Sequence, residues 1–158
     1  MRIENLVFRL VGVSRREAKP DLGCAMYRDM VKLFRKAESS VRIVSGGFPY
    51  RLYGSEGIVN ALKQALDRRC TVEVITGPEA SSRSLKLWSS HGASVYVLSE
   101  WPSQHFAVID GKHVRIEDPH SHDEEKRVQY VIDNFKNVGE LNRKFEELKK
   151  QAKPLELE

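Results

Sequence analysis

Apolar residues follow two different spacings along this chain, and the two spacings alternate. Short runs of consecutive apolar and β-branched residues are typical of strands that are buried on both faces. Between these runs, apolar residues recur every three or four positions, which is typical of amphipathic helices. The strand runs cover 41–45, 71–76 and 93–98, and the helical patterns cover 21–39, 57–67 and 81–90. Strands and helices that alternate with short connections predict right-handed crossovers and a parallel or mixed sheet.

The first 20 residues are predicted to form an N-terminal strand and extension. Alternating apolar positions at 3–13 fit a strand, and they also fit a short helix. The polar run 14–19, followed by Pro20, is predicted to break whatever precedes it. Asp21 is then predicted to cap the first long helix.

The C-terminal part of the chain adds one strand and one helix to this pattern. The strand is predicted at 128–132 and the amphipathic helix at 138–151, and residues 154–158 are expected to fray. The sequence contains no internal repeat and no low-complexity tract. With 158 residues, the chain is long enough to bury a core, and residues 1–158 are predicted to form one α/β domain.

A predicted hairpin concentrates the chemistry-bearing residues of the chain. Residues 104–109 read as an apolar strand, Asp110-Gly111-Lys112 as a turn, and 113–116 as a second alternating strand. The segment 117–122 that follows is rich in acidic residues and histidine. This order places several titratable groups at one end of a buried sheet, where we expect the active or binding site.

Composition and charge narrow the functional classes only a little. The 41% hydrophobic and 30% charged residues are typical of a soluble globular protein. A formal net charge of +4 favours phosphate-bearing partners without proving them. Cys24 and Cys70 are too few for a disulfide framework or a zinc site, so free thiols in a reducing compartment are expected. No run approaches the length of a membrane span, and a cytoplasmic location is the expectation.

From Asp21 to Leu148, the order of these elements and the hairpin itself resemble the phospholipase D-like family. Members of this family carry H-x-K-x-x-x-x-D-G on the hairpin and a later Gly-Ser-x-Asn segment. The resemblance implies an α/β fold with a mixed sheet and helices on both faces. It also implies a histidine that attacks the phosphorus of a phosphodiester, while lysine, serine and asparagine hold the phosphate. Single-motif members pair their motifs across a dimer, so the resemblance implies a homodimer as well.

Alignment on Asp110 shows where the chain departs from the family pattern. Ser103 stands where the nucleophilic histidine belongs, and His105 stands where the lysine belongs. Glu117, Asp118 and His120 replace the later Gly, Ser and Asn. Ser103 lacks an evident activating base, and the two carboxylates would repel a phosphodiester unless protonated or bridged by a metal. Ordinary phospholipase D-type catalysis is therefore not expected.

Candidate binding residues come from the hairpin and from the glycine loop after the strand at 41–45. The glycines could let backbone N–H groups approach an anion, although a plain turn explains them as well. His105 is either a site imidazole or a hydrogen-bonded core histidine. The acidic and histidine residues after the hairpin match no standard metal-ligand spacing, so no metal and no cofactor are predicted. The predicted ligand-binding residues are Ser103, His105, Asp110, Asp118, His120, Gly47 and Arg51.

The sequence thus predicts non-catalytic recognition of a phosphate-bearing or other anionic ligand, in a regulatory role. A nucleic acid and a lipid headgroup are the ligand classes considered. The first alternative is a phosphodiesterase or nuclease that uses His105 with Asp118 or His120. The second alternative is a protein-interaction module, which predicts no small ligand at all.

Overall fold

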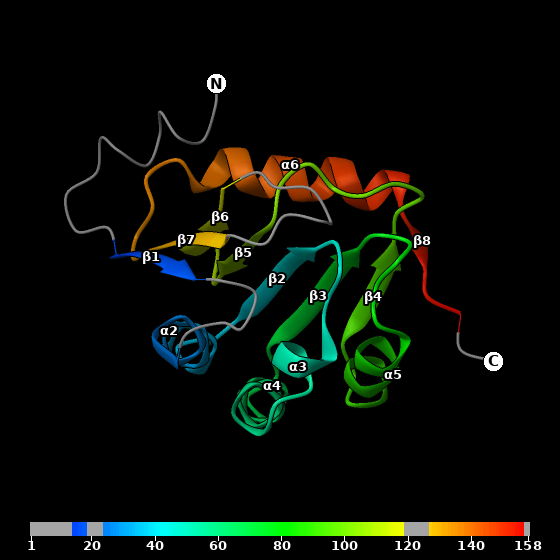
Figure 1. Cartoon of the computed structure of the whole chain (residues 1–158), viewed down its shortest axis with the longest axis horizontal. Helices are drawn as coiled ribbons and strands as arrows, with labels where there is room; N and C mark the ends of the chain where they lie inside the picture. Colours follow the sequence, from blue (N-terminus) through cyan, green and yellow to red (C-terminus); the bar gives the residue numbers. More distant parts are fainter. Residues whose placement is uncertain (1–13, 19–23, 119–126, 157–158) are drawn as a thin grey trace.

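The computed structural model describes residues 14–18, 24–118 and 127–156. In this part of the chain, eight strands form one mixed sheet (Figure 1). The strands, in spatial order, are β1 (Ser14–Ala18), β7 (Arg127–Ile132), β6 (His113–Glu117), β5 (Phe106–Ile109), β2 (Ser40–Ser45), β3 (Thr71–Thr76), β4 (Ser94–Val97) and β8 (Lys153–Pro154).

Parallel and antiparallel pairing meet at β2. On one side, β2 runs parallel to β3, and β3 runs parallel to β4. On the other side, β2 pairs with β5 in the antiparallel direction, and the antiparallel ladder continues through β6 and β7 to β1. The mixed sheet that the sequence pattern predicted is confirmed, with the hairpin as its antiparallel addition.

Helices cover both faces of the sheet, as the resemblance implied (Figure 1). One face carries α2 (Cys24–Arg35), α3 (Tyr50–Tyr53), α4 (Glu56–Asp67) and α5 (Ser82–Ser90), and the opposite face carries α6 (Val138–Gln151). Alternate residues of each strand enter different cores, because side chains of a strand point to opposite faces. Ile43 packs in the core under α2 and α4, whereas its neighbour Val44 packs in the core under α6.

Helix α6 is fixed to the sheet by apolar and charged contacts. Phe145 is fully buried. Glu73, a buried carboxylate of β3, receives the Nζ of Lys149 at 2.5 Å and the Nε of Arg42 at 3.3 Å. The guanidinium of Arg42 also lies 2.6 Å from Glu146. Lys149 and Glu146 of α6 therefore hold the helix against the sheet through ion pairs.

The polar run 14–18 forms strand β1, which the apolar spacing did not indicate. Its predicted role as a break after the strand at 3–13 concerns residues outside the described part of the chain. Its backbone completes a ladder with β7, in which Ser14 lies opposite Val131. An edge strand has only one neighbour, so polar residues can occupy it without the apolar pattern that identifies a central strand. The predicted strand at 3–13 and the predicted cap Asp21 lie outside the described residues.

Two further segments are more ordered than the sequence indicated. The loop after β2 contains the short helix α3, whose first turn is closed by hydrogen bonds from Leu52 and Tyr53 to the carbonyl of Pro49. Within the segment expected to fray, Leu155 donates to the carbonyl of Val95 at 2.8 Å next to the two-residue strand β8. Among the described residues, no helix combines the length and the hydropathy needed to cross a bilayer.

Candidate functional site

The predicted site residues separate to the two ends of strand β5. His105 comes immediately before β5 and Asp110 immediately after it. At about 3.3 Å per residue, the two backbones are roughly 16 Å apart along the strand. They therefore belong to different neighbourhoods, although they are close in the sequence.

Asp110 serves the structure of its own end of the sheet. Its carboxylate accepts hydrogen bonds from the backbone N–H groups of Glu38, Ser39 and Ser40 and from the Ser39 hydroxyl, at 2.8–3.1 Å. Burial alone would raise the pKa of Asp110, but these hydrogen bonds lower it below its usual value. The φ of Asp110 is 56° and that of Gly111 is 66°, which Asp and Gly adopt more readily than other residues. The carboxylate thus ties the hairpin turn to the loop before β2.

At the other end of β5, a row of charged and polar side chains crosses neighbouring strands. Arg115 lies between Val114 and Ile116 in β6, both of which face the core under α6. Alternation along the strand therefore turns Arg115 and Glu117 toward the face covered by α2 to α5. Glu117 lies opposite Gln129 of β7, and its backbone N–H donates to the carbonyl of His105 at 3.0 Å.

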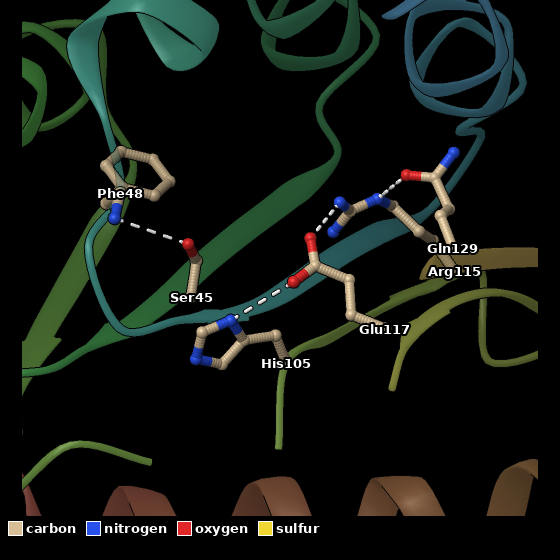
Figure 2. Close-up of polar contacts among 6 residues, drawn as sticks. All are labelled: Ser45, Phe48, His105, Arg115, Glu117 and Gln129. Carbon is tan, nitrogen blue, oxygen red and sulfur yellow. Dashed lines mark hydrogen bonds and ion pairs between the residues drawn. The ribbon is translucent and has the colours of Figure 1, made fainter. Parts of the chain in front are cut away.

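These side chains form one continuous hydrogen-bonded row (Figure 2). The guanidinium of Arg115 donates through Nε to Gln129 Oε1 and through Nη2 to Glu117 Oε1. The second carboxylate oxygen of Glu117 lies 3.2 Å from His105 Nδ1. Arg115 is only 2% exposed and His105 only 5% exposed, so the row is a buried ion pair with two polar neighbours. Burial opposes the charge of Arg115, but the adjacent Glu117 raises its pKa above the ordinary value.

An aromatic cluster lies on the same face as this row. Phe48 and Tyr53 stack with ring centroids 3.9 Å apart, and Trp88 Nε1 donates to the Tyr53 carbonyl at 2.8 Å. Burial raises the pKa of the Tyr53 phenol, while Arg115 and a hydrogen bond with Ser45 partly counteract it. The hydroxyl of Ser45 also accepts the backbone N–H of Phe48 at 3.3 Å (Figure 2). The Tyr53 phenol therefore lies within electrostatic range of Arg115 and Glu117 in the charged row.

The glycine loop packs against Trp101. A Cβ on Gly46 would lie 2.7 Å from the Trp101 ring, so only glycine allows this close approach. The same ring lies 5.0 Å from the His105 ring, centroid to centroid. Gly47, predicted to bind a ligand, accepts a hydrogen bond from the Ser81 N–H through its carbonyl at 3.0 Å. Packing of the tryptophan is thus one reason for glycine at this turn.

The remaining predicted residues lie near this end of the sheet or beyond the described part. Ser103 is exposed in the segment before β5, and Arg51 is exposed on α3. Asp118 is half-buried, and its carboxylate lies 3.5 Å from the Tyr130 hydroxyl. His120 lies outside the described residues, so the predicted grouping of His120 with His105 stays a prediction. Within residues 14–18, 24–118 and 127–156, no three histidine, cysteine or acidic side chains come together as metal ligands.

The sequence interpretation missed Arg115 and Gln129. A signal for Arg115 was present, because an arginine and a glutamate two positions apart on a buried strand share one face. Opposite charges at that spacing, next to a segment that carries His105, indicate a buried pair. Gln129 had no comparable signal, because its pairing with Glu117 depends on the register between β6 and β7.

Comparison with known proteins identifies the fold. No family model and no curated protein sequence matches this chain. Among solved structures, the phospholipase D family member Nuc from Salmonella typhimurium is similar with a TM-score of 0.68 and 13% identity, over 92% of this chain and 99% of Nuc. NucT from Helicobacter pylori is similar with a TM-score of 0.63 and 15% identity, over 90% of this chain and 99% of NucT. The archaeal chromatin protein TrmBL2 is similar with a TM-score of 0.66 and 14% identity, over 97% of this chain but only 59% of TrmBL2. The chain therefore has the phospholipase D-like fold that its hairpin predicted.

Proposed function

We propose that this chain is a phospholipase D-like domain that has lost phosphodiester chemistry and recognises a phosphate-bearing or other anionic ligand in a regulatory role. The observation that carries the proposal is the buried row from His105 through Glu117 to Arg115. A phosphoryl group needs free cationic or hydrogen-bonding groups around it. Among the described residues, the one buried guanidinium, that of Arg115, already has a carboxylate partner, so a group of the chain itself takes the place that a phosphate would need.

The nucleophile position supports the same conclusion. Ser103 replaces the family histidine and is exposed. A serine attacks only when a base within hydrogen-bond reach removes its proton. The closest candidate in the sequence, His105, is buried and directs Nδ1 to Glu117.

The anionic character of the ligand rests on charge and on the residues around this end of the sheet. The chain has a formal net charge of +4, and both Arg51 on α3 and Ser103 in the segment before β5 are exposed. TrmBL2, whose DNA binding has been described, shares the fold over 97% of this chain. DNA therefore belongs among the anions to test, together with nucleotides and lipid headgroups.

Thermal unfolding in the presence of such anions tests this proposal. A ligand that binds only the native state at about 100 times its Kd adds about 2.7 kcal/mol to the free energy of unfolding. We expect Arg51→Gln combined with Ser103→Ala to reduce that stabilisation. Lys63→Gln combined with Ser90→Ala, at exposed positions of α4 and α5, is the matched control. If no anion raises the melting temperature, the binding function is wrong.

One observation favours the enzymatic alternative. Glu117 holds Nδ1 of His105, and an imidazole oriented by a carboxylate through one nitrogen is suited to act through the other. Hydrolysis of bis(4-nitrophenyl) phosphate separates the two functions. We expect no hydrolysis above the buffer rate. Hydrolysis that is lost in His105→Gln would replace the binding function by a phosphodiesterase, whereas hydrolysis that survives this change would not originate at His105.

A further inference from the structure

A polar pocket lies at the end of the sheet opposite His105. Its volume is about 480 Å³, and it is formed where α2 and α4 end, beside the β5–β6 turn and the end of β7. Asp110, Lys112 and His113 contribute from the hairpin, and Asp133 and Asn134 from the end of β7. Ala37 is the one residue with an apolar side chain in the lining, so the pocket suits a strongly polar ligand.

Hydrogen bonds fix the walls of this pocket before any ligand binds. Arg68 donates to the carbonyl of Ala37 at 2.9 Å, which holds the end of α4 against the end of α2. The backbone N–H of Phe135 donates to the carbonyl of Lys112 at 2.7 Å. The N–H of Asn134 lies 3.3 Å from His113 Nδ1, an arrangement in which this ring nitrogen is the acceptor. A site that is already ordered loses little conformational entropy when it binds a ligand.

The charges in the lining leave an excess of cations. Asp110 is occupied by backbone N–H groups, and Asp133 lies 2.9 Å from Lys36 Nζ. The hydrogen bond from Lys36 lowers the pKa of Asp133, so this carboxylate stays ionised and paired. Neither Arg35 nor Lys112 makes an ion pair within the described residues. Of the lining carboxylates, Asp110 is held by N–H and hydroxyl donors and Asp133 by Lys36, which leaves Glu38 with neither kind of contact through its carboxylate in the described part of the chain.

The partial charges at the ends of α2 and α4 also contribute to the electrostatics of the pocket. The carboxyl end of a helix carries partial negative charge, which would disfavour an anion at the ends of α2 and α4. The guanidinium of Arg68 reduces this effect at α2, because it donates to the carbonyl of Arg35, the last residue of that helix, and to the carbonyl of Ala37 just beyond it. Among the residues that the structure describes, the lining therefore presents Arg35 and Lys112 as cations outside any ion pair, in front of a helix end whose partial negative charge is reduced.

We propose that this pocket binds a small phosphate-bearing molecule, with Arg35 and Lys112 on the phosphate oxygens and the side chain of Asn134 as a further donor. Phosphate accepts paired hydrogen bonds from a guanidinium and attracts an ammonium group, and both groups are present. Glu38 limits the site to ligands whose negative charge outweighs its own. This inference is independent of the function proposed for the other end of the sheet, which lies roughly 16 Å away along β5.

Backbone-amide NMR of the whole chain tests the proposal, with sodium phosphate and AMP added separately at constant ionic strength. We expect shifts at Lys112, His113 and Asn134, and none at Ser103 to Phe106. Arg35→Gln combined with Lys112→Gln should weaken binding by about tenfold or more, because two charge-assisted hydrogen bonds are lost. Glu38→Gln should strengthen binding. Lys63→Gln with Lys86→Gln changes the net charge equally on exposed faces of α4 and α5 and serves as the control.

The outcomes separate cleanly. Saturable shifts at the pocket, with phosphate or with AMP, that are weakened by the double change in the pocket and retained in the control support the site. The proposal is overturned if neither compound shifts these amides, or if the control weakens binding equally. A 12-base-pair DNA duplex is the third probe. If the duplex shifts the same amides and neither small phosphate does, the surface is a nucleic-acid contact and the small-ligand site is wrong.

Discussion

The carboxylate of Asp110 lies 2.8 Å from the backbone N–H of Ser39, although 71 positions separate the two residues in the chain. This contact and its three companions join the turn of the hairpin to the loop that leads into β2. Of the residues that define the hairpin motif H-x-K-x-x-x-x-D-G, the chain keeps Asp110 and Gly111. Retention of Asp110 is thus explained by structure, without any contact to a ligand.

Changing Asp110 to Asn should destabilise the fold by about 2 kcal/mol, because several N–H donors lose an ionised acceptor. Asparagine also tolerates the positive φ of this position, so the substitution isolates the effect of charge. Since the pKa of Asp110 is lowered in the folded state, its contribution is present above the pKa of the unfolded chain, about 3.9. The contribution is lost as the pH falls through the lower pKa of the folded state.

Urea unfolding between pH 3 and pH 7 measures this effect. The variant should differ most from the original chain at neutral pH, and the two should converge at acid pH. Asp67→Asn, at an exposed position at the end of α4, is the control and should change stability little. A constant difference across the pH range would mean that the charge of Asp110 is not the stabilising feature.

Replacing only one partner of the buried ion pair between Arg115 and Glu117 should strongly destabilise the fold. Arg115→Met leaves the Glu117 carboxylate buried without its guanidinium, and Glu117→Leu leaves the guanidinium without its carboxylate. Each should reduce the free energy of unfolding by about 3–5 kcal/mol. The double variant should lose much less than the sum, because no uncompensated charge remains. Additive losses in chemical unfolding would contradict a direct pairing.

Gly46→Ala should destabilise the chain by about 1–3 kcal/mol, because its Cβ would overlap the Trp101 ring at 2.7 Å. Removing the ring with Trp101→Ala should itself cost stability, but Gly46→Ala should then add almost nothing. Melting temperatures of the four proteins complete this cycle. At Gly139, where a Cβ meets nothing within 4 Å, the same change to alanine should have no such cost.

The contact between Lys149 of α6 and Glu73 of β3 predicts a loss of stability at alkaline pH. A hydrogen bond with Glu73 raises the pKa of Lys149 above its ordinary value. The contribution of this contact is therefore complete below the unfolded pKa of about 10.4 and is lost as the pH rises through the higher folded value. Glu73→Gln should remove it, with a cost of about 1 kcal/mol at neutral pH. Denaturant unfolding should show that the difference in the free energy of unfolding between the original chain and Glu73→Gln is smaller at pH 11 than at pH 8. If that difference is the same at both pH values, Lys149 is not its source.

The order of secondary structure could be predicted because each central element carries its own apolar spacing. The helix predicted at 138–151 coincides with α6, and the strand predicted at 71–76 coincides with β3. Strand β1 and strand β8 could not be predicted, since their stability comes from backbone pairing with β7 and β4. Pairing of that kind leaves no mark in the hydropathy of a short polar segment.

The location of the candidate site was easier to predict than its contents. The hairpin and its turn were visible in the sequence, and the fold places His105 beside the glycine loop through Trp101. The charged row depends on register: Glu117 meets both His105 and Arg115 only because β5, β6 and β7 align as they do. Register is a property of the assembled sheet, and a one-residue shift would turn these side chains to the other face.

During synthesis, strand β2 gains its two neighbouring strands at different times. Its parallel partner β3 follows after one helical crossover, with Val41 opposite Val72. Its antiparallel partner β5 emerges much later, with Val41 opposite Ile109. Until then, one side of β2 has unpaired N–H and C=O groups, which a second nascent chain could pair with. Strand β2 is therefore central in the folded sheet but is an edge strand, open to intermolecular pairing, until β5 has been synthesised.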